Sequence, residues 1–322
     1  MAEPRPRHIL TIRDLKTYFP VKRGVIARTV GYVRAVDGVS LFMEKKEILG
    51  LVGESGCGKT TLARTVLMLE KPVSGQILFS GKDLSGFRRH ELGDLRKRLQ
   101  IIFQDPVASL NPRMNVLDIV TEGLVQHGMV EGNRESHAAR LLSEVGLGRD
   151  ALYRYPHEFS GGQRQRISIA RAISLRPDLI VCDEPVSALD VSVQAQIINL
   201  LLALRERHGL SYLFISHDLS VVGYIADRIA VMYLGRIVET GPSGDVMETP
   251  KHPYSQALLS AVPAPGVHRK KRIVLSGETP SPMTPPPGCV FHTRCPKVMP
   301  VCRREIPKET VSGRHHVWCH LY

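Results

Sequence analysis

The sequence predicts an α/β protein with a mainly parallel sheet, and the chain between residues 98 and 218 shows why. The runs "RLQIIFQ" (98–104) and "DLIVCDEP" (178–185) are short and apolar, which predicts buried strands. The run "VSVQAQIINLLLALRERHG" (191–209) predicts a helix that Gly209 can end in the left-handed conformation. "LSYLFISHD" (210–218) follows as another strand. This order of strand, helix and strand favours parallel pairing.

The composition is that of a folded protein, with 322 residues of which 43% are hydrophobic and 23% charged. The opening stretch "MAEPRPRHIL" has no apolar core of a signal peptide, and no apolar run reaches the ~20 residues of a membrane-spanning helix. We therefore expect a cytoplasmic protein. The net charge of +12 suits nucleic acid, nucleotides or an anionic membrane face without choosing among them. The short basic run at 268–272 is expected to be a solvated linker.

The pattern along the chain predicts two regions. Strand-like and helical runs alternate up to about residue 250, and the stretch from about 106 to 160 is mostly helical, as an inserted subdomain would be. Beyond it prolines accumulate in "TPSPMTPPPGC" (279–289), which indicates a linker. The sequence thus predicts a large domain at 1–250 and a smaller C-terminal region at 251–322.

A phosphate-binding loop is predicted at "GESGCGKTT" (53–61), which fits G-x-x-x-x-G-K-[ST] between a strand and a helix. Its glycines let backbone N–H groups face phosphate oxygens, and the helix N-terminus adds partial positive charge. Lys59 would reach the β- and γ-phosphates, and Thr60 would ligate Mg²⁺. The expected nucleotide contacts are Gly53, Glu54, Ser55, Gly56, Cys57, Gly58, Lys59, Thr60 and Thr61.

An acidic pair, Asp183 and Glu184, stands at the end of the apolar run 178–185. A carboxylate at this place can hold Mg²⁺, and the next residue can polarise an attacking water. Because successive strand residues point to opposite faces, both can act together only if the strand ends here, as Pro185 indicates. Alone, the pair would equally suit a capped strand end. The phosphate loop upstream favours the catalytic interpretation.

The stretch "FSGGQRQR" (159–166) resembles the signature motif of ATP-binding cassette (ABC) ATPases, and further motifs of that family follow in order. Gln104 matches the Q-loop, "SALD" from Ser187 to Asp190 matches the D-loop, and His217 matches the switch histidine. Phe19 lies near where the family stacks an aromatic ring on adenine, with Tyr18 as the alternative. The resemblance implies a P-loop NTPase with a RecA-like core, an antiparallel β subdomain and a helical subdomain.

The resemblance also implies roles for these residues. In the family two cassettes stack head to tail, and the signature motif of one contacts the ATP of the other. Glu184 would be the general base, His217 would contact the γ-phosphate, and Gln104 would sense Mg²⁺ and the attacking water. Mg²⁺ would be held by Thr60, Gln104 and Asp183. The residues that would contact the partner's ATP are Ser160, Gly161, Gly162 and Gln163.

Several stretches resemble a narrower group, the ATPase subunits of bacterial dipeptide and oligopeptide importers. They include "VRAVDGVS" (33–40), "FQDPVASLNPRMNV" (103–116) and "HPYSQALLSAVP" (252–263). The extended segment before the phosphate loop is more similar to the second ATPase of such systems, the F subunit. The resemblance implies a sister ATPase in a heterodimer, two membrane permease subunits, and a peptide-binding protein that acts indirectly.

This narrower resemblance places the protein at the cytoplasmic face of the cell membrane, with no nucleic acid among its partners. Two alternatives remain open at this point. Nickel importers share much of the pattern, and the basic charge would suit a soluble cassette ATPase that acts on nucleic acid or ribosomes. The latter class usually carries a long coiled-coil insertion or two cassettes in one chain, and this sequence has neither.

Four of the six cysteines gather near the C-terminus: Cys289, Cys295, Cys302 and Cys319. In a reducing cytoplasm, a metal or cluster suits them better than disulfides. Their spacing is looser than the C-x₂₋₄-C pairs of structural zinc, and unliganded thiols are the third alternative. The resemblance implies a [4Fe–4S] cluster. We expect His292, His315, His316 and His320 to lie on the surface or beside the ligands.

Overall fold

The computed structural model describes residues 8–24, 28–84, 86–87, 91–130, 132–261 and 273–322. The chain divides into two compact units. Unit 1 consists of residues 1–43, 48–85 and 216–322, and unit 2 of residues 44–47 and 86–215. The basic run at 268–272 lies outside the described residues. No helix in the described ranges is both long and apolar enough to span a bilayer.

Unit 1 contains an antiparallel sheet in the order β2-β1-β4-β5. The long strands β1 (His8–Arg23) and β2 (Arg28–Glu44) are accompanied by β4 (Ser74–Phe79) and β5 (Lys82–Asp83). Register between β1 and β4 shifts between Arg13 and Lys16, where Asp14 has a positive φ. This sheet is the antiparallel β subdomain that the resemblance implied.

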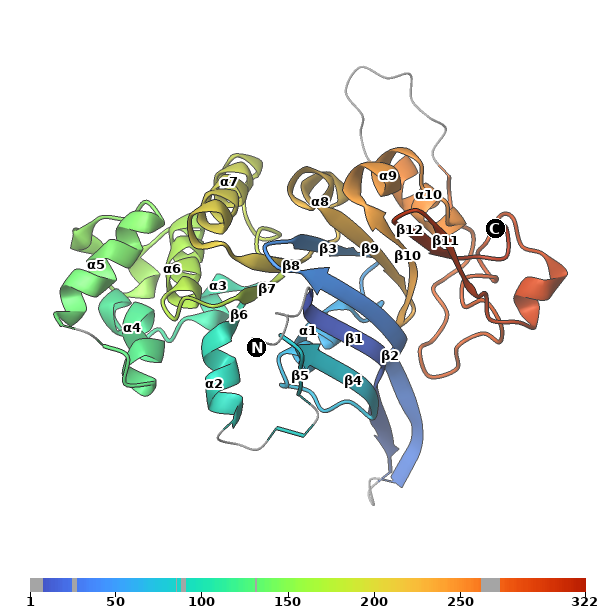
Figure 1. Cartoon of the computed structure of the whole chain (residues 1–322), viewed down its shortest axis with the longest axis horizontal. Helices are drawn as coiled ribbons and strands as arrows, with labels where there is room; N and C mark the ends of the chain where they lie inside the picture. The colour runs from blue at the N-terminus through green and yellow to red at the C-terminus, as the bar shows by residue number, and fades with distance from the viewer. Residues whose placement is uncertain (1–7, 25–27, 85, 88–90, 131, 262–272) are drawn as a thin grey trace, which may run out of the picture. The chain divides into compact units, whose positions relative to one another are not determined.

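A second group of strands in unit 1 carries the phosphate loop. The buried strand β3 (Ile48–Val52) pairs in parallel with β9 (Arg228–Tyr233), which pairs antiparallel with β10 (Arg236–Pro242). The last strands of the chain continue this order: β12 (His315–Trp318) pairs with β10, and β11 (Glu309–Ser312) pairs with β12 (Figure 1). Every residue of β3 and β9 is buried, as expected for strands covered on both faces.

The helices of unit 1 are short. They are α1 (Lys59–Val66), α8 (Leu219–Ile225), α9 (Ser243–Glu248), α10 (Pro253–Ser260) and the 3₁₀ turn η3 (Pro300–Arg303). Helix α10 begins with His252 as its N-cap, whose side chain accepts a hydrogen bond from the Tyr254 N–H, and Pro253 takes the first turn, where no N–H is needed. The motif "HPY" is therefore a helix start.

Unit 2 has a parallel sheet of β6 (Leu99–Ile102), β7 (Leu179–Asp183) and β8 (Ser211–Ile215), with β7 in the middle. These are the three strands predicted from the apolar runs. The predicted helix is α7 (Val191–His208), and it ends at Gly209 with φ 65° in the left-handed region. Both features of the prediction are confirmed.

The rest of unit 2 is helical. It contains α2 (Glu91–Arg98), α3 (Pro106–Ser109), α4 (Val116–Gln126), α5 (Arg134–Glu144), η1 (Arg149–Ala151), η2 (Pro156–Glu158) and α6 (Gly161–Ile173). Helix α6 packs against α3, α4 and α5, and these helices gather around it in the green part of the ribbon (Figure 1). The helical character predicted for 106–160 is confirmed.

Candidate functional site

The phosphate loop connects β3 to α1 in unit 1, and two of its glycines are required by close backbone contacts. Gly58 has φ 109°, and a Cβ there would lie 2.0 Å from the carbonyl oxygen of Ala35. At Gly53 a Cβ would lie 2.1 Å from the carbonyl oxygen of Met232. Real Cβ atoms do not approach this closely, so only glycine permits this path of the chain. Ser55 and Gly56 lie exposed at the outer turn of the loop.

Lys59 is held inside the loop. Its side chain is 5% exposed, and Nζ donates hydrogen bonds to the carbonyl oxygens of Gly53 (2.7 Å) and Glu54 (2.9 Å). Thr60 and Thr61 follow, half-buried, in the first turn of α1. The ammonium group is thus fixed within the curl of the loop, as a phosphate-binding lysine must be.

Cys57 fills the loop from within. It is 3% exposed, and burial raises the pKa of its thiol above the ordinary value despite the nearby Lys59 ammonium. Its carbonyl oxygen accepts a hydrogen bond from the Gly235 N–H at 2.9 Å. A buried protonated thiol is a packing group rather than a reactive nucleophile.

The acidic pair lies at the end of β7 in unit 2. The strand ends at Asp183, and Glu184 takes the left-handed conformation with φ 48°, so the chain turns between the two residues as predicted. Asp183 is 6% exposed. Gln104, which follows β6, donates a hydrogen bond from Nε2 to Glu184 Oε2 at 3.1 Å. The structure therefore brings together two residues that the resemblance assigned to the same site, Glu184 as general base and Gln104 as sensor.

The signature residues form the start of α6. Ser160 is the N-cap, and a capping box links it to Gln163: the Gln163 N–H donates to Ser160 Oγ (3.3 Å), and the Ser160 N–H donates to Gln163 Oε1 (3.0 Å). A Cβ at Gly162 would lie 2.6 Å from Val193 Cγ1 of α7, whereas Gly161 has no contact below 3.5 Å. Exposed backbone N–H groups at a helix start are suited to bind an anion.

Of the remaining predicted residues, Ser187, Asp190 and His217 lie on short connections, whereas Phe19 and Tyr18 lie in β1. Ser187 Oγ donates to the Glu184 carbonyl oxygen at 3.1 Å, and Asp190 is the N-cap residue of α7. His217 is exposed between β8 and α8, and Phe19 is half-buried in β1. The hydroxyl group of Tyr18, the alternative to Phe19, donates to Asp37 Oδ1 at 2.5 Å.

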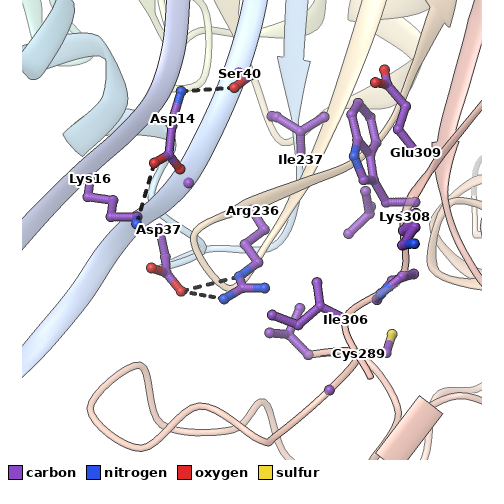
Figure 2. A pocket seen from close by; sticks show the side chains of 16 residues that line it. Asp14, Lys16, Asp37, Ser40, Arg236, Ile237, Cys289, Ile306, Lys308 and Glu309 are labelled. Carbon is purple, nitrogen blue, oxygen red and sulfur yellow. Dashed lines mark hydrogen bonds and ion pairs between the residues drawn. The ribbon is translucent and has the colours of Figure 1, made fainter. Parts of the chain in front are cut away.

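A cavity of about 550 Å³ in unit 1 was not foreseen from the sequence (Figure 2). Its wall carries the ion pair between Asp37 and Arg236, 2.7 Å apart, and burial together with the Asp37 carboxylate raises the pKa of Tyr18 to about 12. Hydrogen bonds from Tyr18 and Arg236 outweigh burial and lower the pKa of Asp37. The lining comes from β1, β2, β10 and residues 273–322, which we call the C-terminal segment. The lining residues are Asp14, Lys16, Asp37, Gly38, Ser40, Arg236, Ile237, Val238, Gly288, Cys289, Val290, Ile306, Pro307, Lys308, Glu309 and Trp318.

The C-terminal segment contains four cysteines, Cys289, Cys295, Cys302 and Cys319. Burial raises the pKa of Cys289 to about 11, and the nearby thiols of Cys302, Cys319 and Cys295 add to the rise. Cys289 and Cys302 are also joined by a backbone hydrogen bond of 2.9 Å. In the described part of the chain, no three His, Cys, Asp or Glu side chains form a group that could hold a metal ion.

Of the two places expected for His315, on the surface or beside the ligands, the structure contradicts the surface. It is 4% exposed, and its Nε2 lies 2.6 Å from Oε1 of Glu239, which is fully buried in β10. Pairing of β12 with β10 buries this histidine, and a histidine needs a polar partner there. His316 and His320 instead contact Glu309 and the Glu305 carbonyl oxygen near the surface.

Sequence reasoning also missed the partners of Glu54 in the phosphate loop. Its carboxylate accepts hydrogen bonds from Arg294 and Thr279, and its N–H donates to the Tyr254 hydroxyl oxygen. The only signals were the stretch "HPY" and the arginine directly before Cys295, and neither points to a loop some 200 residues earlier. A contact of this range is invisible to motif spacing.

Comparison with known proteins agrees with this geometry. The family described as ABC transporter matches residues 36–187, and the C-terminal region of oligopeptide/dipeptide transporters matches residues 238–302. The oligopeptide transport ATP-binding protein AppF of Bacillus subtilis is 54% identical, and the match covers 100% of each chain. The chain belongs to the oligopeptide-transport branch of the ABC transporter ATPases.

Two further relatives of this ABC ATPase are informative. The oligopeptide transport ATP-binding protein OppF of Salmonella typhimurium is 49% identical over 97% of this chain and 95% of its own. A solved dimeric ATP-binding cassette in a post-hydrolysis state, bound to ADP and Pi, has a TM-score of 0.65 and 25% identity, and the match covers 73% of this chain and 98% of that one. The fold is that of an ABC nucleotide-binding domain, with a mixed sheet and helices, and the protein is an ATPase.

Proposed function

We propose that this chain binds and hydrolyses ATP to energise the import of dipeptides or oligopeptides through a membrane ABC transporter. The observation that carries the proposal is the full-length match to AppF, because it includes the C-terminal region and not only the cassette. An ATPase for nucleic acid or ribosomes would have no reason to share that region. The nickel-importer alternative is not favoured, because the similar proteins are named for oligopeptide transport.

The phosphate loop and Lys59 would hold the triphosphate, and Phe19, with Tyr18 as the alternative, would stack on adenine. Mg²⁺ would be held by Thr60, Gln104 and Asp183, and when bound it supplies charge neutralisation to the phosphates.

For hydrolysis, Glu184 would take a proton from the attacking water, and His217 would contact the γ-phosphate. The hydrogen bond from Gln104 keeps the Glu184 carboxylate oriented, and the Ser187 hydroxyl group donates to the carbonyl oxygen of the same turn. This assignment makes Glu184 a catalytic residue and Gln104 a residue that both positions it and senses the nucleotide.

The signature residues would act on a second ATPase chain. Ser160, Gly161, Gly162 and Gln163 would offer a hydroxyl group and backbone N–H groups to the partner's ATP. Ser187 and Asp190 of the D-loop would lie at the same interface. The dimeric state named for the solved cassette supports pairing of two such chains. We propose that the partners are a sister ATPase and two permease subunits, and that a peptide-binding protein delivers the peptide to the permeases. The chain would lie on the cytoplasmic face of the membrane.

The test is ATP hydrolysis by the reconstituted transporter with its binding protein. Short peptides should stimulate hydrolysis, and Glu184→Gln should abolish the stimulated rate. Stimulation by Ni²⁺ and not by any peptide would replace peptides with nickel as the cargo. Hydrolysis that responds only to RNA or ribosomes would overturn the importer assignment.

We further propose that the cysteine-bearing segment is a small module that holds a [4Fe–4S] cluster. The donors have suitable chemistry, because the thiols of Cys302, Cys319 and Cys295 lie near enough to raise the pKa of Cys289, and three of the four cysteines are at most 9% exposed. Cys289, Cys295, Cys302 and Cys319 would be the ligands of the cluster. When bound, it would supply folding energy to a segment that has few apolar residues of its own.

Anaerobic purification tests the cluster. The protein should be brown, with broad absorbance near ~400 nm from cysteinyl iron–sulfur charge transfer, and Cys302→Ser should remove both colour and iron. Colourless protein with one zinc per chain, or with no metal at all, would contradict this proposal and leave the ATPase assignment untouched.

A further inference from the structure

Glu54, the second residue of the phosphate loop, is the point where the C-terminal part of the chain contacts the loop. Arg294 donates from Nη1 to Glu54 Oε2 (2.8 Å) and from Nη2 to Oε1 (3.2 Å), a two-pronged ion pair. Thr279 Oγ1 donates to Glu54 Oε2 at 3.0 Å. The Glu54 N–H donates to the hydroxyl oxygen of Tyr254 at 2.8 Å.

The same residue is held from the other side by the nucleotide-binding lysine. Lys59 Nζ donates to the carbonyl oxygens of Glu54 and Gly53. The N–H and the carboxylate of Glu54 are therefore hydrogen-bonded to Tyr254, Thr279 and Arg294, and its carbonyl oxygen accepts a hydrogen bond from Lys59. A displacement of the Glu54 backbone would therefore move the Lys59 ammonium group relative to a bound phosphate.

Both contact points in the C-terminal part are rigidly supported. The side chain of Arg294 is 9% exposed, and its guanidinium lies 5.9 Å from the ring centre of Tyr233. The ring of Tyr254 packs 4.7 Å from Tyr233 and 5.4 Å from Phe291. Phe291 and Arg294 both lie between Cys289 and Cys295, and we call residues 289–295 the cysteine-bearing turn. This turn therefore supports both the ring of Tyr254 and the ion pair with Glu54.

We propose that Arg294 and Tyr254 are positioning residues that clamp the phosphate loop through Glu54, so that nucleotide affinity depends on the folded cysteine-bearing turn. Neither residue touches the nucleotide. They fix the backbone of Glu54, and through its carbonyl they fix Lys59. The inference rests on the proposed ATP-binding role of the loop and adds residues that no phosphate-loop motif contains.

Loss of the clamp should weaken binding more than chemistry. Arg294→Ala removes two charge-assisted hydrogen bonds, and we expect the Kd for MgATP to rise ~10-fold. Tyr254→Phe keeps the aromatic packing and removes only the acceptor for the Glu54 N–H, so a rise of ~3–5-fold is expected. Because Glu184 is untouched, kcat at saturating ATP should fall less than kcat/KM.

The experiment measures binding of fluorescent MgATP and MgADP analogues to the full-length chain. Its variants are Arg294→Ala, Tyr254→Phe, Glu54→Gln and the Glu54→Gln/Arg294→Ala pair. Arg303→Ala, an exposed arginine of the same segment, is the matched control, and Lys59→Ala reports complete loss of the loop's function. Circular dichroism and the emission of Trp318 verify that each variant is folded.

The clamp predicts that the double variant binds no more weakly than Arg294→Ala, since both changes break the same contact. It also predicts reciprocity: nucleotide should slow hydrogen exchange at residues 289–295 in the wild type and not in Arg294→Ala. Unchanged Kd in folded Arg294→Ala and Tyr254→Phe, or additive effects in the double variant, would overturn the clamp while leaving the ATPase intact. A wild-type chain that binds no MgATP would overturn both.

Discussion

Replacing Glu239 by alanine should destabilise unit 1 severely, although the residue lies outside every nucleotide motif. Glu239 is fully buried in β10 and accepts three hydrogen bonds. They come from His315 Nε2 (2.6 Å), the Lys251 N–H (2.7 Å) and the His252 N–H (2.9 Å). The carboxylate thus joins β10, β12 and the start of α10.

The expected magnitude follows from the donors that the substitution leaves behind. A buried donor without a partner costs ~1–3 kcal/mol, and removing one partner of a buried pair costs ~3–5 kcal/mol. We expect Glu239→Ala to lower the free energy of unfolding by about 4 kcal/mol, a large share of the ~5–15 kcal/mol of a typical domain. Glu239→Gln keeps the shape and one acceptor oxygen, so a loss of ~1–2 kcal/mol is expected.

Urea unfolding followed by tryptophan emission measures this effect directly, because the one tryptophan, Trp318, lies in β12 with His315. With a slope of ~3 kcal/mol per M, the midpoint for Glu239→Ala should fall by more than ~1 M. Glu278→Ala, an exposed glutamate of the C-terminal segment, is the control and should shift it little. Equal midpoints for Glu239→Ala and Glu278→Ala would refute the reasoning.

Three further predictions concern single residues. Glu184→Gln should lower the rate of ATP hydrolysis ~10²–10⁴-fold while MgATP binding, measured by equilibrium dialysis, persists. Gly58→Ala should abolish MgATP binding in the same assay, because its Cβ would lie 2.0 Å from the Ala35 carbonyl oxygen at a φ of 109°. Burial lowers the pKa of His252 from 6.5 to about 3. Between these two pH values the unfolded chain binds a proton at His252 that the folded chain does not bind. The free energy of unfolding should therefore fall by ~2 kcal/mol on going from neutral pH to pH 5. Urea midpoints measured against pH should lose this slope in His252→Gln.

The parallel core of unit 2 could be predicted because its signals are local. The strands β6, β7 and β8 are mostly apolar, and α7 combines a periodic apolar face with Gly209 at its end. The turn at Glu184 was predictable too, from Pro185 after two acids. The long antiparallel strands β1 and β2 followed only from the resemblance, since charged residues interrupt both.

The residues of the candidate site also differ in how local their sequence signals are. Residues that lie within a few positions of each other, such as Gly53 to Thr61 or Ser160 to Gln163, were recognisable as motifs. The partners of Glu54 lie 200, 225 and 240 residues along the chain, and His315 lies 76 residues from Glu239. Only folding brings such side chains together, and their residue types are common on any surface.

These long-range contacts have a consequence for how the ATPase is built. Four rings pack together within a single compact unit: Tyr233 of β9, His252 and Tyr254 at the start of α10, and Phe291 of the C-terminal segment. Burial of these large rings stabilises the cysteine-bearing turn. The same rings hold Tyr254 against the Glu54 N–H. The proposed clamp therefore predicts that a perturbation of the C-terminal segment changes nucleotide binding, and that nucleotide binding changes the stability of this segment.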